Sequence, residues 1–122
     1  MTYVYKTFGI IILTVLAVGF SSVLPVPANA TPPSDIQLSY DISTQTLTAT
    51  ITHASFVPGI HYIKTVEIKK NGQMISANTY KNQPDKKTFT YTYKIPAGIG
   101  DEFEVTATCN MYGSKTVKMV VK

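Results

Sequence analysis

A two-residue alternation of apolar and polar side chains dominates the chain after residue 35. It is clear where Ile36, Leu38, Tyr40 and Ile42 are separated by single residues, all of them polar. A similar period returns in six later segments: 47–53, 61–70, 73–80, 87–95, 102–109 and 115–121. Alternation turns successive side chains to opposite faces, so each segment predicts a half-buried strand. Short strands at near-regular spacing, with no helical pattern between them, predict an all-β, seven-stranded immunoglobulin-like β-sandwich.

Local signals indicate how some of these strands begin and end. Asn71-Gly72 lies between two alternating segments and predicts a tight hairpin. The alternation slips by one residue between Ile63 and Val66, which predicts a β-bulge there. Cys109 continues the inward phase of the segment 102–109 and is therefore expected to face the core.

The N-terminal residues have the pattern of an export signal. An apolar run over residues 8–24 follows Lys6 and precedes Ala28-Asn29-Ala30, whose small-x-small pattern is typical of a cleavage site. We predict a signal peptide over residues 1–30 and an exported domain over residues 31–122. The run approaches the roughly 20 residues that span a bilayer, so an uncleaved anchor is the alternative. The protein would then contact the membrane only through this segment.

The charges and the cysteine count exclude several classes of protein. Without Lys6, ten lysines remain against seven acidic residues, a net charge of +3. Basic runs with interleaved aromatic residues are missing, which argues against nucleic-acid binding, and the small positive excess favours at most small anions. A single cysteine excludes an internal disulfide. Its thiol is therefore a buried core group, an intermolecular partner or a metal ligand.

The only two histidines and the only cysteine lie at the ends of predicted strands. These residues are His53, His61 and Cys109. Imidazole and thiolate groups gathered at strand ends are ligands for a redox transition metal. Each residue also has a structural interpretation: His53 as the cap of an exposed strand end, His61 as a donor to a loop carbonyl, and Cys109 as an inert core residue. The residues alone leave both interpretations open.

The order of these motifs resembles a known family. The sequence elements are Ile51-Thr52-His53, His61-Tyr62-Ile63, Val66-Glu67-Ile68, Asn71-Gly72 and Cys109-Asn110-x-x-Gly113. Together they resemble the iron-binding domain of desulfoferrodoxin and neelaredoxin, the superoxide reductases. The resemblance covers about residues 36 to 121 and implies a seven-stranded immunoglobulin-like sandwich.

The resemblance also implies a mononuclear non-haem iron centre with a reduced set of ligands. In that family, four histidines and one axial cysteine hold the iron. His53 and His61 match two of the histidines, and Cys109 matches the cysteine. Tyr112 stands where the family has its last histidine and is expected to be a weak ligand. The remaining histidine has no counterpart, because residues 31–52 contain none.

Three classes of function follow from this reduced set. The first is a superoxide reductase-like oxidoreductase, with Lys64 or Lys115 attracting superoxide and a separate protein donating electrons. The second is a metal carrier without turnover, with copper as the alternative to iron, since two histidines, a cysteine and a weak Met111 resemble a blue-copper donor set. Zinc also accepts three protein ligands. The third is a non-catalytic sandwich that binds another protein.

Overall fold

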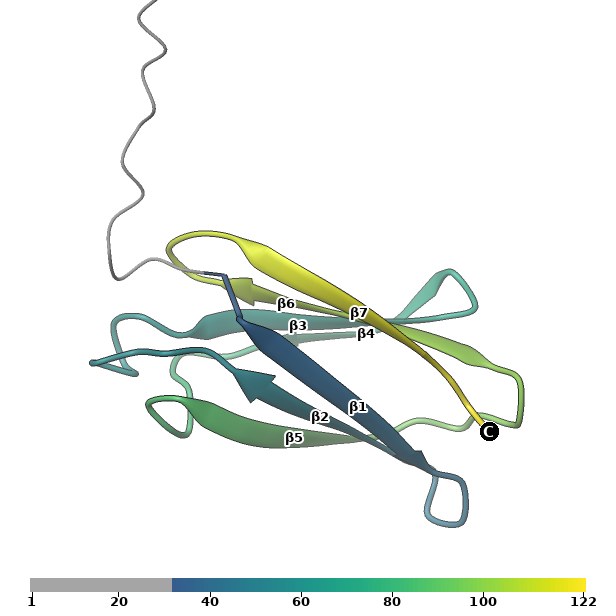
Figure 1. The fold of residues 1–122 in the computed structure, drawn as a ribbon. Coiled ribbons are helices and arrows are strands. Elements are labelled where there is room, and N and C mark those ends of the chain that lie inside the picture. The colour runs from purple at the N-terminus through teal and green to yellow at the C-terminus, as the bar shows by residue number, and fades with distance from the viewer. Residues whose placement is uncertain (1–31) are drawn as a thin grey trace, which may run out of the picture.

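Two β-sheets packed face to face make up the part of the chain that the computed structural model describes, residues 32–122 (Figure 1). The predicted signal peptide over residues 1–30 lies outside the described residues. The strands are β1 (Asp35–Asp41), β2 (Thr46–Thr52), β3 (Ile63–Lys70), β4 (Gln73–Thr79), β5 (Thr88–Lys94), β6 (Glu102–Cys109) and β7 (Ser114–Val120). The predicted seven-stranded β-sandwich is confirmed. Among the described residues there is no helix of the length and apolarity that crossing a bilayer would require.

The strand order follows the immunoglobulin pattern. One sheet has the order β1-β2-β5, and the other has the order β4-β3-β6-β7. All neighbouring strands are antiparallel. These sheets correspond to the A-B-E and C-F-G sheets of an immunoglobulin domain, with β4 added at an edge beside β3. Loops that connect different sheets therefore meet at the two ends of the sandwich.

The core consists of the inward-facing residues that the alternation predicts. Those with no exposed surface are Leu47, Ala49 and Ile51 of β2, Ile63, Val66 and Ile68 of β3, and Phe103, Val105 and Ala107 of β6. β2 lies at the centre of its sheet, and β3 and β6 lie at the centre of theirs. The removal of these apolar side chains from water is the main force that holds the two sheets together.

Both predicted local features of β3 are confirmed. Asn71 and Gly72 have φ values of 51° and 82°, the left-handed pair that a tight hairpin turn requires. The register between β3 and β6 shifts between Ile63 and Thr65, which is the predicted bulge. Beyond the bulge, Ile63 lies opposite Cys109. The irregularity therefore places the start of β3 beside the cysteine.

Candidate metal centre

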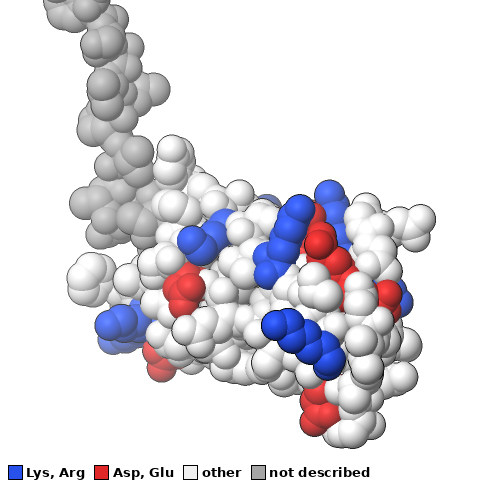
Figure 2. All heavy atoms as spheres, turned by 45° about the vertical axis from the view of Figure 1, so that its right-hand side comes forward, with Lys and Arg blue, Asp and Glu red and all other residues white. Residues whose placement is uncertain are grey.

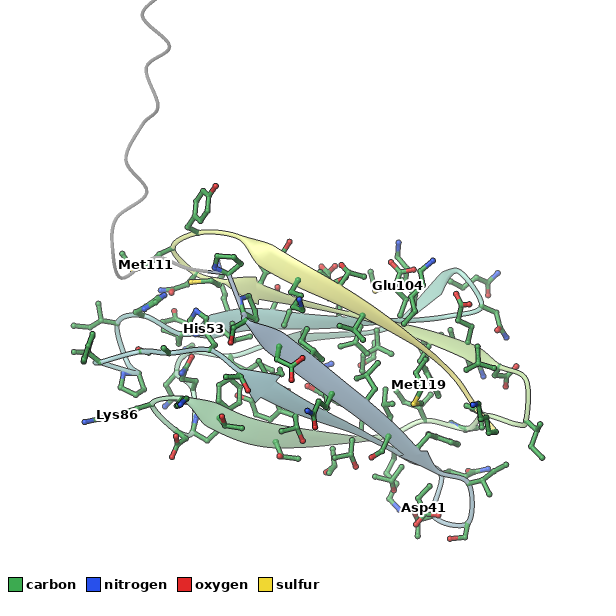
Figure 3. All side chains as sticks on the ribbon, in the orientation of Figure 1. Asp41, His53, Lys86, Glu104, Met111 and Met119 are labelled. Atoms are coloured by element: carbon green, nitrogen blue, oxygen red, sulfur yellow. The ribbon has the colours of Figure 1, made fainter. Side chains whose placement is uncertain are left out.

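Three loops meet at one end of the sandwich, here called the site end: residues 53–62, 80–87 and 110–113. His53 directly follows β2, His61 lies just before β3, and Cys109 is the last residue of β6. In Figure 3, His53, Lys86 and Met111 lie at this end, while Asp41 and Met119 lie toward the other. The site end thus combines a residue from one sheet with two from the other.

His53, His61 and Cys109 converge on one point. One ligand atom from each residue lies within 4.8 Å of those of the other two. His61 Nε2 is 3.1 Å from Cys109 Sγ, and the two imidazole rings pack edge to face with their centroids 4.6 Å apart. The exposed fraction is 0% for His53 and 5% for both His61 and Cys109. The expectation that His53 caps an exposed strand end is therefore wrong, because loop residues from both sheets enclose it.

Gln83 determines which nitrogen of His53 carries the proton. Its Nε2 donates to two carbonyl oxygens, those of His53 at 2.9 Å and Asp85 at 2.8 Å. Its Oε1 accepts from the backbone N–H of Ile63 at 3.2 Å and lies 2.8 Å from His53 Nδ1. Flipping the amide would place an oxygen against two carbonyls and a nitrogen against an N–H, so the orientation is unambiguous.

His53 Nδ1 must therefore donate its proton to Gln83 Oε1. In a neutral imidazole, the second nitrogen then carries the lone pair. This nitrogen is Nε2 of His53. A histidine whose other ring nitrogen is held by a hydrogen-bond acceptor is the usual arrangement around protein-bound metals, because that bond sets both the tautomer and the ring orientation.

His61 is kept in the neutral form that binds metals. Burial lowers its pKa below the ordinary value of 6.5, and the nearby His53 lowers that pKa further. Its backbone is fixed on both sides: the His61 N–H donates to the Val57 carbonyl at 2.9 Å, and the His61 carbonyl accepts from Ser55 Oγ. The short turn thereby orients Nε2 of the ring toward the sulfur of Cys109.

Cys109 occupies the buried position that the alternation predicts. The Met111 N–H lies 3.4 Å from Cys109 Sγ and donates to it, and the Cys109 N–H donates to the Gly113 carbonyl at 2.9 Å. The turn 110–113 therefore directs one backbone N–H, that of Met111, at the sulfur.

Asn110 and Gly113 do more than form a turn. The Asn110 side chain accepts from the Tyr62 N–H at 3.0 Å and donates to the Ile60 carbonyl at 2.9 Å, so it ties the cysteine turn to the histidine loop. Gly113 has a φ of 80°, and a Cβ at this position would lie only 2.8 Å from Pro32 Cβ. Glycine is therefore required here by conformation and by packing.

The weak ligand predicted at Tyr112 stays a prediction. Its side chain is 51% exposed on the cysteine turn, in contrast to the buried His53, His61 and Cys109. Lys64, predicted to attract anions, is exposed near the start of β3, and Lys115 is half-buried near the start of β7. Both lie at the site end.

Sequence reasoning missed Gln83 and Ser55. Gln83 is 3% exposed and Ser55 is 5% exposed, although both lie in segments with the composition of surface loops. Gln83 precedes a proline in Asn82-Gln83-Pro84-Asp85, a sequence typical of a turn. No local signal distinguishes a buried glutamine there from an exposed one.

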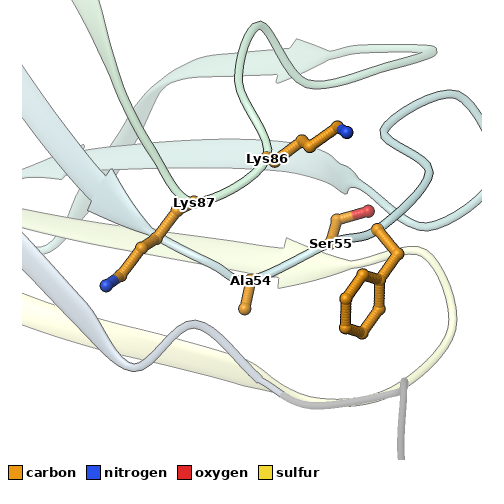
Figure 4. A pocket seen from close by; sticks show the side chains of 5 residues that line it. Ala54, Ser55, Lys86 and Lys87 are labelled. Atoms are coloured by element: carbon orange, nitrogen blue, oxygen red, sulfur yellow. The ribbon is translucent and has the colours of Figure 1, made fainter.

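Two small apolar hollows border the centre. One, of about 150 Å³, is lined by Phe56, Val57, Ile60, His61 and Met111 and therefore lies at the mouth of the site. The other, of about 220 Å³, is lined by Ala54, Ser55, Phe56, Lys86 and Lys87 (Figure 4).

Comparisons with known proteins add a distant likeness of structure. No family model matches the sequence, and no curated protein matches it. A solved structure of the superoxide reductase (neelaredoxin) from Ignicoccus hospitalis has 16% identity and a TM-score of 0.45, over 75% of this chain and 80% of that one. Two variants of that protein have 16% identity and a TM-score of 0.46, over 78% of this chain and 82% of theirs. A likeness of this degree does not extend to the chemistry of the site.

Proposed function

We propose that the domain binds one transition-metal ion through His53, His61 and Cys109. The observation that carries this proposal is the convergence of three buried ligand atoms within 4.8 Å of one another. The Gln83 amide adds to it by directing the lone pair of His53 to Nε2. A structural histidine pair would need no such arrangement around a cysteine.

The residues present fit some metals better than others. Two imidazoles and one thiolate form a nitrogen and sulfur donor set, and among residues 32–122 no acidic residue joins the cluster. Such a set suits zinc, copper and iron and disfavours magnesium and calcium, which prefer oxygen ligands. Three protein ligands leave room for a further ligand from solvent or substrate.

Iron with a superoxide reductase-like activity is the more specific form of this proposal. It rests on the order of the His-Tyr-Ile and Cys-Asn-x-x-Gly elements and on the buried position of Cys109. A bound redox metal would supply one-electron chemistry to a small anion such as superoxide. The chain would contribute the orientation of the ligands, the apolar hollow at the mouth and the positive charge of Lys64 and Lys115, and a separate protein would donate the electron.

Copper is the alternative, and the donor set favours it. Iron(II) stands low in the affinity order for nitrogen and sulfur ligands, whereas copper stands at the top. With two of the family's histidines missing, a three-ligand centre retains copper more readily than iron. A protein that holds copper here would act as a metal or electron carrier without turnover.

Metal titration of three proteins tests the proposal: wild type, Cys109→Ser and Tyr112→His. Wild type should bind one ion per chain and show a thiolate-to-metal absorption band. Cys109→Ser should lose that band and most of the affinity, and Tyr112→His should bind more tightly because it offers a new imidazole beside the thiolate. Met119→Leu, which changes a sulfur at the opposite end, is the matched control and should titrate like wild type.

The choice of metal and the activity are separate readouts of the same samples. Iron retention together with superoxide consumption supports the oxidoreductase, whereas copper retention without consumption supports the carrier. If neither wild type nor Tyr112→His binds a transition metal, the proposal is wrong. The domain would then be a sandwich for protein interaction.

A further inference from the structure

Large apolar side chains project from two loops of the site end. They belong to Phe56, Val57, Ile60, Met111 and Tyr112, with exposed fractions of 84%, 51%, 68%, 51% and 51%. We call these five residues the apolar crown. Four of them line a single hollow together with His61, so they form one surface. Grouped exposed apolar side chains on a small domain indicate a binding surface.

The positive charge of the domain is concentrated at the same end. Five lysines lie in the loops or the adjoining strand ends there, Lys64, Lys81, Lys86, Lys87 and Lys115, against two aspartates, Asp35 and Asp85. That excess of three equals the net charge of residues 32–122, which contain ten lysines and seven acidic residues. Figure 2 turns the opposite end toward the viewer, and there lysines and acidic residues intermingle.

The hollow in Figure 4 is lined both by a residue of the apolar crown and by two of these lysines. Phe56 lines it together with the two exposed lysines Lys86 and Lys87. Lysine side chains cover apolar surface with their methylene stems and keep the ammonium group in water. An apolar hollow with ammonium groups at its edge matches a molecule that has an acyl chain and an anionic head.

The described chain also begins at this end. Pro32 lies against Gly113 in the cysteine turn, next to Met111 and Tyr112 of the crown. In the sequence, the apolar run over residues 8–24 ends eight residues before Pro32. Eight extended residues reach about 30 Å at most. Whenever that run lies in a bilayer, as a signal or as an anchor, Pro32, beside the cysteine turn that carries Met111 and Tyr112, is held within this distance of lipid.

We propose that the apolar crown and the surrounding lysines dock the site end onto an anionic phospholipid bilayer. The crown side chains enter the boundary between headgroups and acyl chains, and the lysines contact anionic headgroups, in the way that interfacial segments bind membranes. An acidic protein would pair with the lysines. It would not explain why the exposed apolar side chains of the crown lie beside the part of the chain that follows the apolar run over residues 8–24. The docking needs no metal and is independent of the proposed centre.

The absence of tryptophan from the chain allows a site-specific test. The full chain is prepared as Phe56→Trp and, as a matched control at the opposite end, as Ile99→Trp, where the native side chain is 79% exposed. Vesicles contain equal parts of phosphatidylcholine and phosphatidylglycerol. The emission of Phe56→Trp should shift to the blue and be quenched by brominated acyl chains, while that of Ile99→Trp stays unchanged. The reporter reads its own surroundings, so attachment through the N-terminal run does not mimic this result.

The role of charge is tested in the Phe56→Trp background. Lys86→Gln/Lys87→Gln should weaken the affinity for vesicles, measured by the shift in emission, by about fivefold for each lysine removed. Lys69→Gln/Lys122→Gln, which removes two lysines elsewhere, should leave this affinity unchanged. Vesicles of phosphatidylcholine alone should shift the emission less.

Four results would overturn the proposal. They are an unshifted Phe56→Trp, an equal shift in Ile99→Trp, an unchanged response in Lys86→Gln/Lys87→Gln, and a shift without lipid that grows with protein concentration. The last would show that a second copy of the chain covers the crown. Metal titration of the same protein is unaffected by each of these outcomes, so the two proposals fail separately.

Discussion

At the end of the sandwich opposite the proposed centre, most of the polar groups that hold the turns are exposed. Asp41 Oδ1 accepts from the Ser43 N–H at 2.9 Å and the Ser43 hydroxyl at 2.6 Å, both two residues away. At the site end, His53 and Gln83 are thirty residues apart and His61 and Cys109 forty-eight, and all four are buried. The first end also has contacts between distant residues, such as Asn71 with Asp101, but these are exposed to water, whereas those of the second end are buried.

This difference in burial determines how much a substitution lowers the free energy of unfolding. When an exposed turn loses a side chain, water replaces the lost partner. When a buried network loses a side chain, neither water nor another protein group replaces the lost hydrogen-bond partner. The site end should therefore be the more sensitive of the two. Four predictions test this comparison, from the largest expected effect to the smallest.

Gln83→Ala should give the largest loss of stability. It removes the partners of His53 Nδ1, the Ile63 N–H and the His53 carbonyl, all buried. We expect the free energy of unfolding to fall by about 3 kcal/mol. Urea denaturation measures this. Asn82→Ala, at the exposed neighbouring position, is the control and should change stability by less than about 0.5 kcal/mol. Equal losses in the two variants would contradict the comparison.

Two glycines with the same backbone conformation compare the ends directly. Gly113 at the site end has a φ of 80°, and a Cβ there would meet Pro32. Gly72 at the other end has a φ of 82°, and a Cβ there would meet nothing within 4 Å. Gly72→Ala should cost about 1 kcal/mol, for the strained conformation alone. Gly113→Ala should cost about 1 kcal/mol more, because Pro32 must also move. Thermal or urea unfolding of both variants decides this, and a smaller loss for Gly113→Ala would refute the packing argument.

The site end should respond to pH in the range where histidine titrates. The folded pKa of His61 lies below its unfolded value of 6.5, chiefly because of burial. Below pH 6.5 the unfolded chain therefore binds more protons than the folded one, so the free energy of unfolding decreases as the pH is lowered. The metal-free protein should be less stable at pH 5 than at pH 7 by urea denaturation. His61→Gln should flatten this dependence; a slope as steep as that of wild type would assign the titration elsewhere.

The opposite end should respond only at lower pH and more weakly. The Gly98 N–H and then the Asn71 amide lower the pKa of Asp101 below 3.8. A carboxyl group whose folded pKa is lowered adds stability above its unfolded pKa and loses it as pH falls through the folded value. In an acid titration of stability, the advantage of wild type over Asp101→Asn should therefore be constant above about pH 3.8 and should disappear as the pH falls below that value. Solvent screens this exposed group, so the difference should be the smallest of the four. Parallel curves for the two proteins would show that Asp101 has no part in acid unfolding.

Much of the fold follows from local signals. The period of two along each strand determines which residues face the core, and it correctly predicted a buried Cys109. Asn71-Gly72 predicted the hairpin because few other pairs adopt left-handed φ values at two consecutive positions. The phase slip after Ile63 predicted the bulge for a similar reason: a strand with an extra residue must change the face of every side chain beyond it. Each of these features depends on neighbours in the sequence.

The centre required the tertiary structure. The positions of His53, His61 and Cys109 at strand ends, and the family order of their motifs, suggested a shared site, but alternation does not specify how two sheets are placed face to face. Nor did it distinguish a buried His53 from an exposed one. Gln83 was missed because its role arises only after β2, β3 and the loop 80–87 are packed together. The sequence by itself determined the strands and the inward thiol; packing of the sheets decided the ligand distances, the tautomer of His53 and the gathering of the crown. The physical reason is that strand periodicity is encoded between adjacent residues, whereas these properties depend on contacts between residues far apart in the chain.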